Sequence, residues 1–249
     1  RKQIEYEYAR NAYPDGFPKI PDISGKRYTD KDFFDLEFEK IFLKSWLMVF
    51  RENEIPNPGD FKIFDKLQRD ILIVRQNDYS IKAFYNTCSH RGAPVVREKK
   101  GSTKLLKCQY HSWAYELDGS LLRVPDERDF LELDLSCRGL KNVHCDTWDG
   151  WIYVSLSKED PGSLIDFLDP VASEMKCFNS SELITIWQNS TIVKANWKTC
   201  LDAFMEVYHS PTIHRETVNI LLDGNGMAAG LLKNGHSRMV TPKRINLDG

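Results

Sequence analysis

Two short cysteine–histidine pairs near the middle of this 249-residue chain constrain its fold more than any other feature. The first is C-S-H, with Cys88 and His90, and the second is C-Q-Y-H, with Cys108 and His111. Thiolates bind soft metals and imidazoles bind borderline ones. The four side chains therefore predict a metal centre built from two loops, each of which supplies one sulfur and one nitrogen ligand.

Two kinds of centre use two sulfur and two nitrogen ligands. One is tetrahedral Zn²⁺, and the other is a [2Fe-2S] cluster in which two cysteines hold one iron and two histidines hold the other. Zinc fingers usually place both cysteines in one short pair and both histidines in the other. Each pair mixes the two types here, which favours the cluster. Zinc and four unrelated core side chains are the alternatives.

The residues around the pairs carry a family resemblance. N-T-C-S-H-R-G-A-P at 86–94 and C-Q-Y-H-S-W-A-Y-E-L-D-G-S-L at 108–121 resemble the Rieske domains of bacterial oxygenases. The resemblance covers roughly residues 40–160. It implies that Cys88, His90, Cys108 and His111 bind a [2Fe-2S] cluster in an all-β domain.

A second candidate site lies in the last quarter of the chain. Asn196 is a plausible N-cap for a helix from Trp197 to His209, which Pro211 would close. On that helix Asp202, Glu206 and His209 would share one face. Taken alone, this pattern indicates only an amphipathic helix whose polar face is exposed to solvent. His214, five residues beyond His209, would allow two imidazoles and a carboxylate to form the facial triad of a non-haem Fe(II) site.

The string N-W-K-T-C-L-D-A-F-M-E-V-Y-H-S-P-T-I-H at 196–214 resembles the mononuclear-iron segment of Rieske oxygenase catalytic subunits. The resemblance implies that His209 and His214 bind the iron and that Glu206, usually an Asp in the family, links the two metal centres. The family's third ligand is an Asp far beyond the second histidine, and 35 residues follow His214 here. Asp223 and Asp248 match no part of that motif. We therefore expect the chain to be truncated within its catalytic domain.

Composition argues against two classes of partner, nucleic acid and anionic membranes. The charge of −2 and the absence of long runs of one sign favour neither nucleic acid nor an anionic membrane. No apolar run is long enough to cross a membrane. The other four cysteines lack the spacing of a disulfide scaffold, which indicates buried, reduced thiols and a cytoplasmic protein; they are Cys137, Cys145, Cys177 and Cys200.

The sequence divides into three parts: an N-terminal arm at 1–45, the Rieske domain at 46–160 and the start of a catalytic domain at 161–249. The arm contains an amphipathic stretch from Asp30 to Trp46, and the segment from Pro161 to Pro170 is predicted to be a linker. Strands are expected at Phe61–Phe64, Ile71–Val74, Ile81–Phe84, around His144 and Cys145, at Gly150–Leu156 and at Leu183–Val193.

The resemblance implies an α+β protein in which the Rieske β-domain precedes a helix-grip (Bet v 1-like) catalytic domain. The implied function is the alpha subunit of an aromatic-ring-hydroxylating type of oxygenase, a homotrimer that acts on O₂ and a small organic molecule. Electrons from NAD(P)H would arrive through a reductase, with or without a ferredoxin. The alternative is a Rieske electron carrier without catalysis. The basic loop Arg97–Lys107 would either dock an acidic donor or be a solvated loop.

Overall fold

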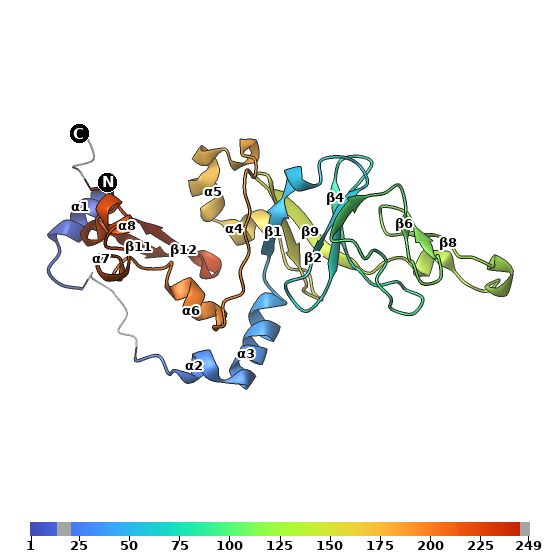
Figure 1. Ribbon diagram of the computed structural model, residues 1–249, viewed down its shortest axis with the longest axis horizontal. Helices are drawn as coiled ribbons and strands as arrows, with labels where there is room; N and C mark the ends of the chain where they lie inside the picture. Colours follow the sequence, from blue (N-terminus) through green and yellow to red (C-terminus); the bar gives the residue numbers. More distant parts are fainter. Residues whose placement is uncertain (14–20, 245–249) are drawn as a thin grey trace. The chain divides into compact units, whose positions relative to one another are not determined.

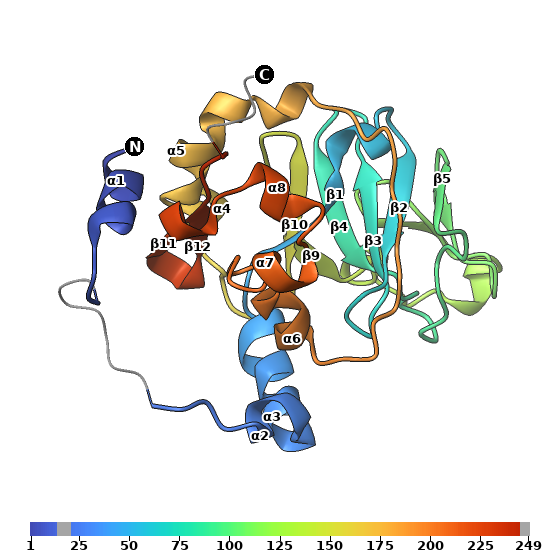
Figure 2. The same cartoon turned by 60° about the vertical axis from the view of Figure 1, so that its left-hand side comes forward.

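The computed structural model describes residues 1–13 and 21–244, which form two compact units (Figures 1 and 2). The larger unit comprises residues 37–167 and 172–188, and the smaller comprises 1–36, 168–171 and 189–249. Pro14 and Pro18 of the arm and Asp248 lie outside the described residues. Within the described ranges, no helix is long and apolar enough to cross a membrane.

The larger unit is built on a seven-stranded antiparallel sheet with the order β1-β10-β9-β4-β3-β2-β5 (Figure 2). A second sheet, with the order β6-β7-β8, carries the second cysteine–histidine loop. The strands predicted around Phe61, Ile71, Ile81, His144 and Trp151 are all present. Their bounds are β1 Leu47–Arg51, β2 Asp60–Phe64, β3 Ile71–Arg75, β4 Ile81–Tyr85, β5 Lys100–Ser102, β6 Leu106–Lys107, β7 Ala114–Tyr115, β8 Leu121–Arg123, β9 Asn142–Trp148 and β10 Trp151–Ser155.

Strand β3 is buried on both faces, and this places a hydrophobic core on each side of the sheet. Because side chains alternate along a strand, Leu72 and Val74 face one core, whereas Ile71 and Ile73 face the other. The first core also contains Cys88 and Cys108. The predicted ligand loops are therefore packed against the most deeply buried strand of the sheet.

The amphipathic stretch from Asp30 is helical as predicted, although it ends four residues early. Helix α3, Lys31–Glu37, continues into a π-helical turn at Phe38–Phe42. Trp46 is buried, and its indole Nε1 donates a hydrogen bond to the Gly162 carbonyl at 3.2 Å. The linker predicted at 161–170 is wrong in part, because it contains helix α4, Leu164–Leu168, whose two leucines, one turn apart, are buried.

The strand predicted at Leu183–Val193 does not form. The segment is irregular, and its apolar side chains are exposed; Ile186 is 90% and Ile192 is 93% exposed. A strand needs a neighbour for its backbone hydrogen bonds, and the described residues provide none here. Arg51 fixes the start of the segment, since its Nη2 donates to the Leu183 carbonyl at 2.8 Å.

The helix predicted from Trp197 to His209 forms only over its first six residues, and a second short helix begins after His209. Helix α6 spans Trp197–Asp202 with Asn196 as its cap, and α7 spans Ser210–Ile213. Pro211 lies in the first turn of α7, where its missing N–H costs nothing, so it starts a helix instead of closing one. The remaining elements are helices α1 Lys2–Ala9, α2 Lys26–Thr29, α5 Val171–Met175 and α8 Val218–Leu221, strands β11 Ala228–Leu231 and β12 Ser237–Val240, and 3₁₀ turns at 52–54, 127–129, 135–137, 176–178, 180–182, 224–226 and 233–235.

Helix α1 packs within the smaller unit. The Tyr8 hydroxyl donates to Asp223 Oδ2 at 2.9 Å. A Cβ at Gly226 would lie 2.7 Å from the Tyr8 ring, so a glycine is needed for this approach. The contact ties the N-terminal arm to the segment that follows the two histidines.

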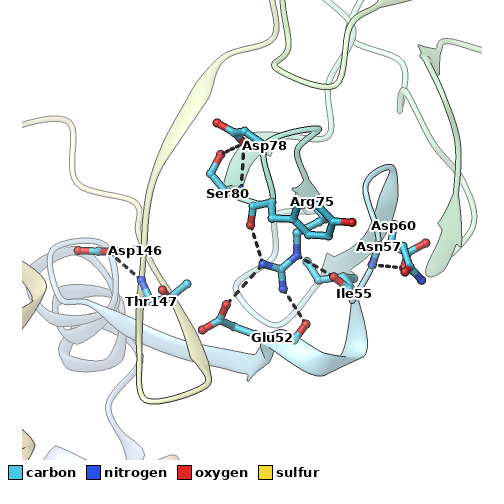
Figure 3. A network of polar contacts seen from close by, with 10 residues as sticks. Glu52, Ile55, Asn57, Asp60, Arg75, Asp78, Ser80, Asp146 and Thr147 are labelled. Carbon is cyan, nitrogen blue, oxygen red and sulfur yellow. Dashed lines mark hydrogen bonds and ion pairs between the residues drawn. The ribbon is translucent and has the colours of Figure 1, made fainter. Parts of the chain in front are cut away.

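Arg75 at the end of β3 is a buried cation that organises the neighbouring turns of the larger unit (Figure 3). Its guanidinium donates to the carbonyls of Ile55, Glu52 and Tyr79, each at 2.9 Å. The carboxylate of Glu52 accepts a further, longer contact at 3.5 Å. The Arg75 side chain thereby pairs three backbone carbonyls, two from residues 52–55 and one from the turn at Tyr79.

Replacing Arg75 with Met should destabilise the larger unit by about 3–5 kcal/mol, because it removes several charge-assisted hydrogen bonds and leaves one buried and two partly buried carbonyls unpaired. The shift of the urea unfolding midpoint measures this loss. Arg128→Met, at an exposed site, is the control and should change stability by less than about 0.5 kcal/mol. Equal stability of both variants would show that the Arg75 contacts contribute nothing.

Candidate functional site

The two cysteine–histidine loops have the same backbone geometry. In the first, Cys88 N donates to Ala93 O at 2.8 Å and Gly92 N donates to Cys88 O at 2.9 Å. In the second, Cys108 N donates to Trp113 O and Ser112 N donates to Cys108 O, both at 2.9 Å. Gly92 and Ser112 occupy the same place in the two loops, and both have positive φ, +75° and +60°. The loops are therefore two copies of one chelating turn.

The four predicted ligands lie in these turns with buried sulfurs. Cys88 is 3% and Cys108 is 1% exposed. The rings of His90 and His111 meet edge to face with centroids 4.7 Å apart. His90 Nδ1 is buried and has no hydrogen-bond partner. A buried polar atom without a partner is costly, and a metal ion would satisfy it. The donor chemistry therefore fits a metal centre at these turns.

The surroundings of the two turns disfavour a protonated His90 and a free Cys88 thiolate. Burial lowers the pKa of His90, and the neighbouring His111 lowers it further. Burial also raises the pKa of the Cys88 thiol, although a hydrogen bond from Tyr115 acts in the opposite direction. Neutral imidazole is the form that binds metal, and a metal cation would stabilise the thiolate that burial disfavours.

The distribution of donors bears on which metal centre these residues suit. Within residues 1–13 and 21–244, no three His, Cys, Asp or Glu side chains converge on one point as a metal ion would require. A structural Zn²⁺ needs four donors about a single centre. A [2Fe-2S] cluster needs only two protein donors at each of two irons. Each turn supplies one sulfur and one nitrogen donor, and it is this mixed pairing that favours the cluster over zinc.

Three aromatic residues of the second loop surround the predicted ligands, and the sequence reasoning gave them no role. Tyr115 is buried, and its hydroxyl lies 3.1 Å from Cys88 Sγ and accepts a hydrogen bond from Ser89 N at 3.1 Å. Trp113 stacks on His90 with centroids 4.8 Å apart. The ring centroid of exposed Tyr110 lies 3.9 Å from that of His111. All three belong to the quoted string at 108–121, and their aromatic spacing was the available signal.

The second candidate site is arranged around α7. His209 precedes this helix and His214 follows it, so a single turn separates the two imidazoles. Their ring centroids lie 5.2 Å apart at 65°. The expected convergence is present, although it comes from a one-turn helix and not from a bend after a long one.

Glu206 holds His209 in place. Glu206 Oε2 accepts the His209 backbone N–H at 3.1 Å, and Oε1 contacts the ring Nδ1. The hydrogen bond to His209 lowers the pKa of Glu206. Because Nδ1 is engaged by the carboxylate, Nε2 is the nitrogen left for a metal, an orientation typical of metal-bound histidine.

The other acids near this segment do not complete a site. Asp202 was expected on the face shared with Glu206 and His209, but it accepts a hydrogen bond from the Tyr28 hydroxyl at 2.8 Å. The reason is that α6 ends at Asp202, which breaks the helical periodicity. Asp223 is engaged by Tyr8. The described residues thus offer two histidines and one orienting carboxylate.

Two family models match consecutive parts of the chain. Residues 45–144 match the Rieske [2Fe-2S] domain, and residues 165–246 match the catalytic domain of the ring hydroxylating alpha subunit. The first range contains the paired chelating turns, and the second contains the two histidines around α7.

Named relatives agree with these matches. The chain is 33% identical over 196 residues to the glycine betaine monooxygenase oxygenase subunit of Pseudomonas aeruginosa, covering 79% of the chain and 45% of the relative. It is 34% identical over 228 residues to the large oxygenase component of the 2,4-dinitrotoluene dioxygenase system of a Burkholderia species, covering 88% and 49%. The chain thus spans about half the length of these relatives.

Solved structures show the same likeness. A quaternary ammonium Rieske monooxygenase superposes with a TM-score of 0.74 at 27% identity, over 79% of this chain and 55% of that one. The α+β order expected from the sequence, with the all-β domain first, is confirmed. The chain belongs to the Rieske-type non-haem iron oxygenases and carries a Rieske [2Fe-2S] domain followed by part of an alpha-subunit catalytic domain.

Proposed function

We propose that the protein is the terminal oxygenase component of a multicomponent Rieske oxygenase. The observation that carries this proposal is the presence in one chain of two matched cysteine–histidine turns and a separate histidine pair with its own carboxylate. A Rieske electron carrier would need only the first of these, and the match to a catalytic domain at 165–246 disfavours it. The proposed domains are an arm at 1–45, a Rieske domain at 46–160 and the start of a catalytic domain at 161–249.

Cys88, His90, Cys108 and His111 are the proposed cluster ligands, and His209 and His214 are the proposed ligands of a mononuclear Fe(II). A carboxylate outside this sequence would complete the facial triad. When bound, the cluster supplies one-electron transfer and the mononuclear iron supplies O₂ activation.

The chain's own residues tune and orient these centres. The Tyr115 hydroxyl lies 3.1 Å from the Cys88 sulfur and would donate to a metal-bound thiolate there, which would favour the more negative, reduced form of the cluster. Glu206 fixes the His209 ring and leaves Nε2 available. In the proposed homotrimer, Glu206 of one subunit also meets His111 of its neighbour, so that one carboxylate orients a ligand of each centre.

The proposed reaction is hydroxylation, dihydroxylation or demethylation of a small organic molecule, with electrons from NAD(P)H passed on by a separate reductase, with or without a ferredoxin. The relatives named above act, by their names, on glycine betaine and on 2,4-dinitrotoluene. We propose a cytoplasmic location because none of the six cysteines is in a disulfide, as is usual in reducing compartments.

Cys88→Ser should abolish the cluster, because a serine hydroxyl is a poor ligand for the iron that cysteine sulfur holds. Iron and acid-labile sulfide analysis, together with the visible absorption spectrum, measures the loss. Cys177→Ser is the matched control and should retain the full spectrum, because this thiol, like that of Cys137, is exposed and not buried as the sequence predicted. A colourless wild-type protein that contains zinc and no labile sulfide would contradict the assignment.

The double change His209→Ala, His214→Ala should remove the mononuclear iron alone. A full-length protein with both centres holds about three irons per chain, and the variant should hold about two. The cluster absorption should be unchanged, since the Rieske turns are untouched. An unchanged iron count would mean that these two histidines bind no metal.

Glu206→Gln should leave both metals bound and slow the transfer of electrons between them by roughly 10- to 100-fold, because an amide no longer orients the two imidazoles with its charge. Rapid mixing of the reduced full-length protein with O₂ and substrate follows cluster reoxidation. Glu132→Gln, on an exposed loop, should behave as wild type. If the Glu206→Gln variant and the wild-type protein reoxidised equally fast, Glu206 would have no role in electron transfer between the two centres.

A further inference from the structure

Tyr28 of the N-terminal arm contacts both ends of helix α6, which precedes the proposed iron histidines in the chain. Its hydroxyl donates a hydrogen bond at 2.8 Å to Oδ2 of Asp202, the last residue of the helix. Its ring centroid lies 5.4 Å from Nζ of Lys198, in the first turn of the helix. Lys198 and Asp202 are four residues apart and therefore project from the same face of α6. Tyr28 thus covers that face.

The ammonium of Lys198 lies among three aromatic rings. Besides the Tyr28 ring, it lies 5.5 Å from the ring centroid of Phe33 and 5.2 Å from that of Trp197. Each distance is within the roughly 6 Å over which a cation is attracted to the face of an aromatic ring. Tyr28 and Phe33 belong to the arm, whereas Trp197 and Lys198 belong to α6. One cation therefore joins rings from two segments that are far apart in the sequence.

Helix α6 is held against the arm by these contacts and not by a hydrophobic core. The helix is six residues long, and a helix of that length is not stable by itself in water. Neither α6 nor the arm helix α2 contains a buried residue. A hollow of about 680 Å³ is lined by residues of both segments, among them Tyr28, Phe34 and Trp197. The position of α6 therefore depends on the few specific contacts that Tyr28 and Lys198 make.

A short series of hydrogen bonds continues from Asp202 to His209. The Asp202 carbonyl accepts the Met205 N–H at 3.1 Å. Glu206, the next residue, accepts the His209 N–H at 3.1 Å and contacts Nδ1 of the ring. A displacement of Asp202 would therefore be passed, through the turn that follows α6, to the imidazole that Glu206 orients.

We propose that Tyr28 is a positioning residue for the mononuclear-iron site, because it fixes α6 and α6 fixes the turn in which Glu206 orients His209. The proposal rests on the proposed function, in which His209 and His214 bind the iron. Tyr28 acts through Asp202 and Glu206 and not on the metal itself. Its hydrogen bond to Asp202 raises the pKa of the Tyr28 phenol, so the phenol stays protonated and remains the donor at neutral pH.

The arm offers a matched control. Tyr8 also donates to an aspartate, Asp223 Oδ2, at 2.9 Å, but Asp223 follows the two histidines and lies outside the series that ends at His209. Tyr28→Phe and Tyr8→Phe each remove one phenol hydroxyl and keep the ring. Two quantities are measured in the full-length protein with its cluster. They are the Kd of Fe(II) at the mononuclear site, by competition with a chelator, and amide hydrogen exchange over residues 203–209.

Tyr28→Phe should weaken Fe(II) binding about three- to tenfold, less than the roughly 10- to 100-fold that loss of a direct partner of a metal-bound histidine costs. The amides of Met205 and His209 should exchange faster, because their acceptors are less firmly held. Tyr8→Phe should stay within about twofold of wild type in both measurements. The visible spectrum of the cluster should be the same in both variants as in wild type.

Two further variants show which contact carries the effect. Asp202→Ala should weaken Fe(II) binding at least as much as Tyr28→Phe, and adding Tyr28→Phe to it should cause no further loss, because the two changes remove one hydrogen bond. Tyr28→Leu, which also removes the ring beside Lys198, should weaken Fe(II) binding more than Tyr28→Phe does.

Other outcomes overturn the positioning role. Unchanged Fe(II) affinity in Tyr28→Phe would show that the contact with Asp202 does not reach the iron site. Equal losses in Tyr28→Phe and Tyr8→Phe would indicate a general loosening of the arm, and loss of the cluster spectrum in Tyr28→Phe would indicate unfolding. A wild-type protein that holds the cluster but no further Fe(II) is a different result, because it would remove the mononuclear site and the proposed function with it.

Discussion

The packing of two matched chelating turns against a doubly buried strand is the constraint on which the Rieske-containing unit depends. Cys88 and Cys108 belong to the same core as Leu72 and Val74 of β3, so the proposed ligands are held by the hydrophobic effect as well as by their own turns. The buried His90 Nδ1 lacks the hydrogen-bond partner that buried polar atoms usually have. A metal centre at these turns would give this nitrogen a partner.

The second candidate site is held together by local contacts and not by a hydrophobic core. Its two histidines are held close by a one-turn helix and one carboxylate, in a segment whose side chains are mostly exposed. The chain spans about half of the relatives it matches. In the proposed assembly, a carboxylate from the remainder of the protein and a cluster from the neighbouring subunit would complete this centre, so its function is distributed over parts that fold separately.

Sequence reasoning succeeded where one local pattern decides the outcome. The alternation around Phe61, Ile71 and Ile81 predicted three strands, and the paired motifs predicted the turns that hold Cys88 and Cys108. It failed in two places: within the described residues the segment Leu183–Val193 has no strand partner, and the helix after Asn196 ends at Asp202, with a new helix starting at Ser210 beside Pro211. Arg75 and Tyr115 were missed because burial and long-range hydrogen bonds, which no local pattern encodes, give them their roles.

Pulsed EPR of the reduced full-length protein, with histidine labelled by ¹⁵N, tests the central claim most directly. Ligation by His90 and His111 at one iron predicts strong coupling of the electron spin to two histidine nitrogens. His90→Cys should remove one of these couplings. A paramagnetic cluster with no histidine coupling would mean all-cysteine ligation, and a protein with zinc and no signal would mean that the paired turns hold no cluster.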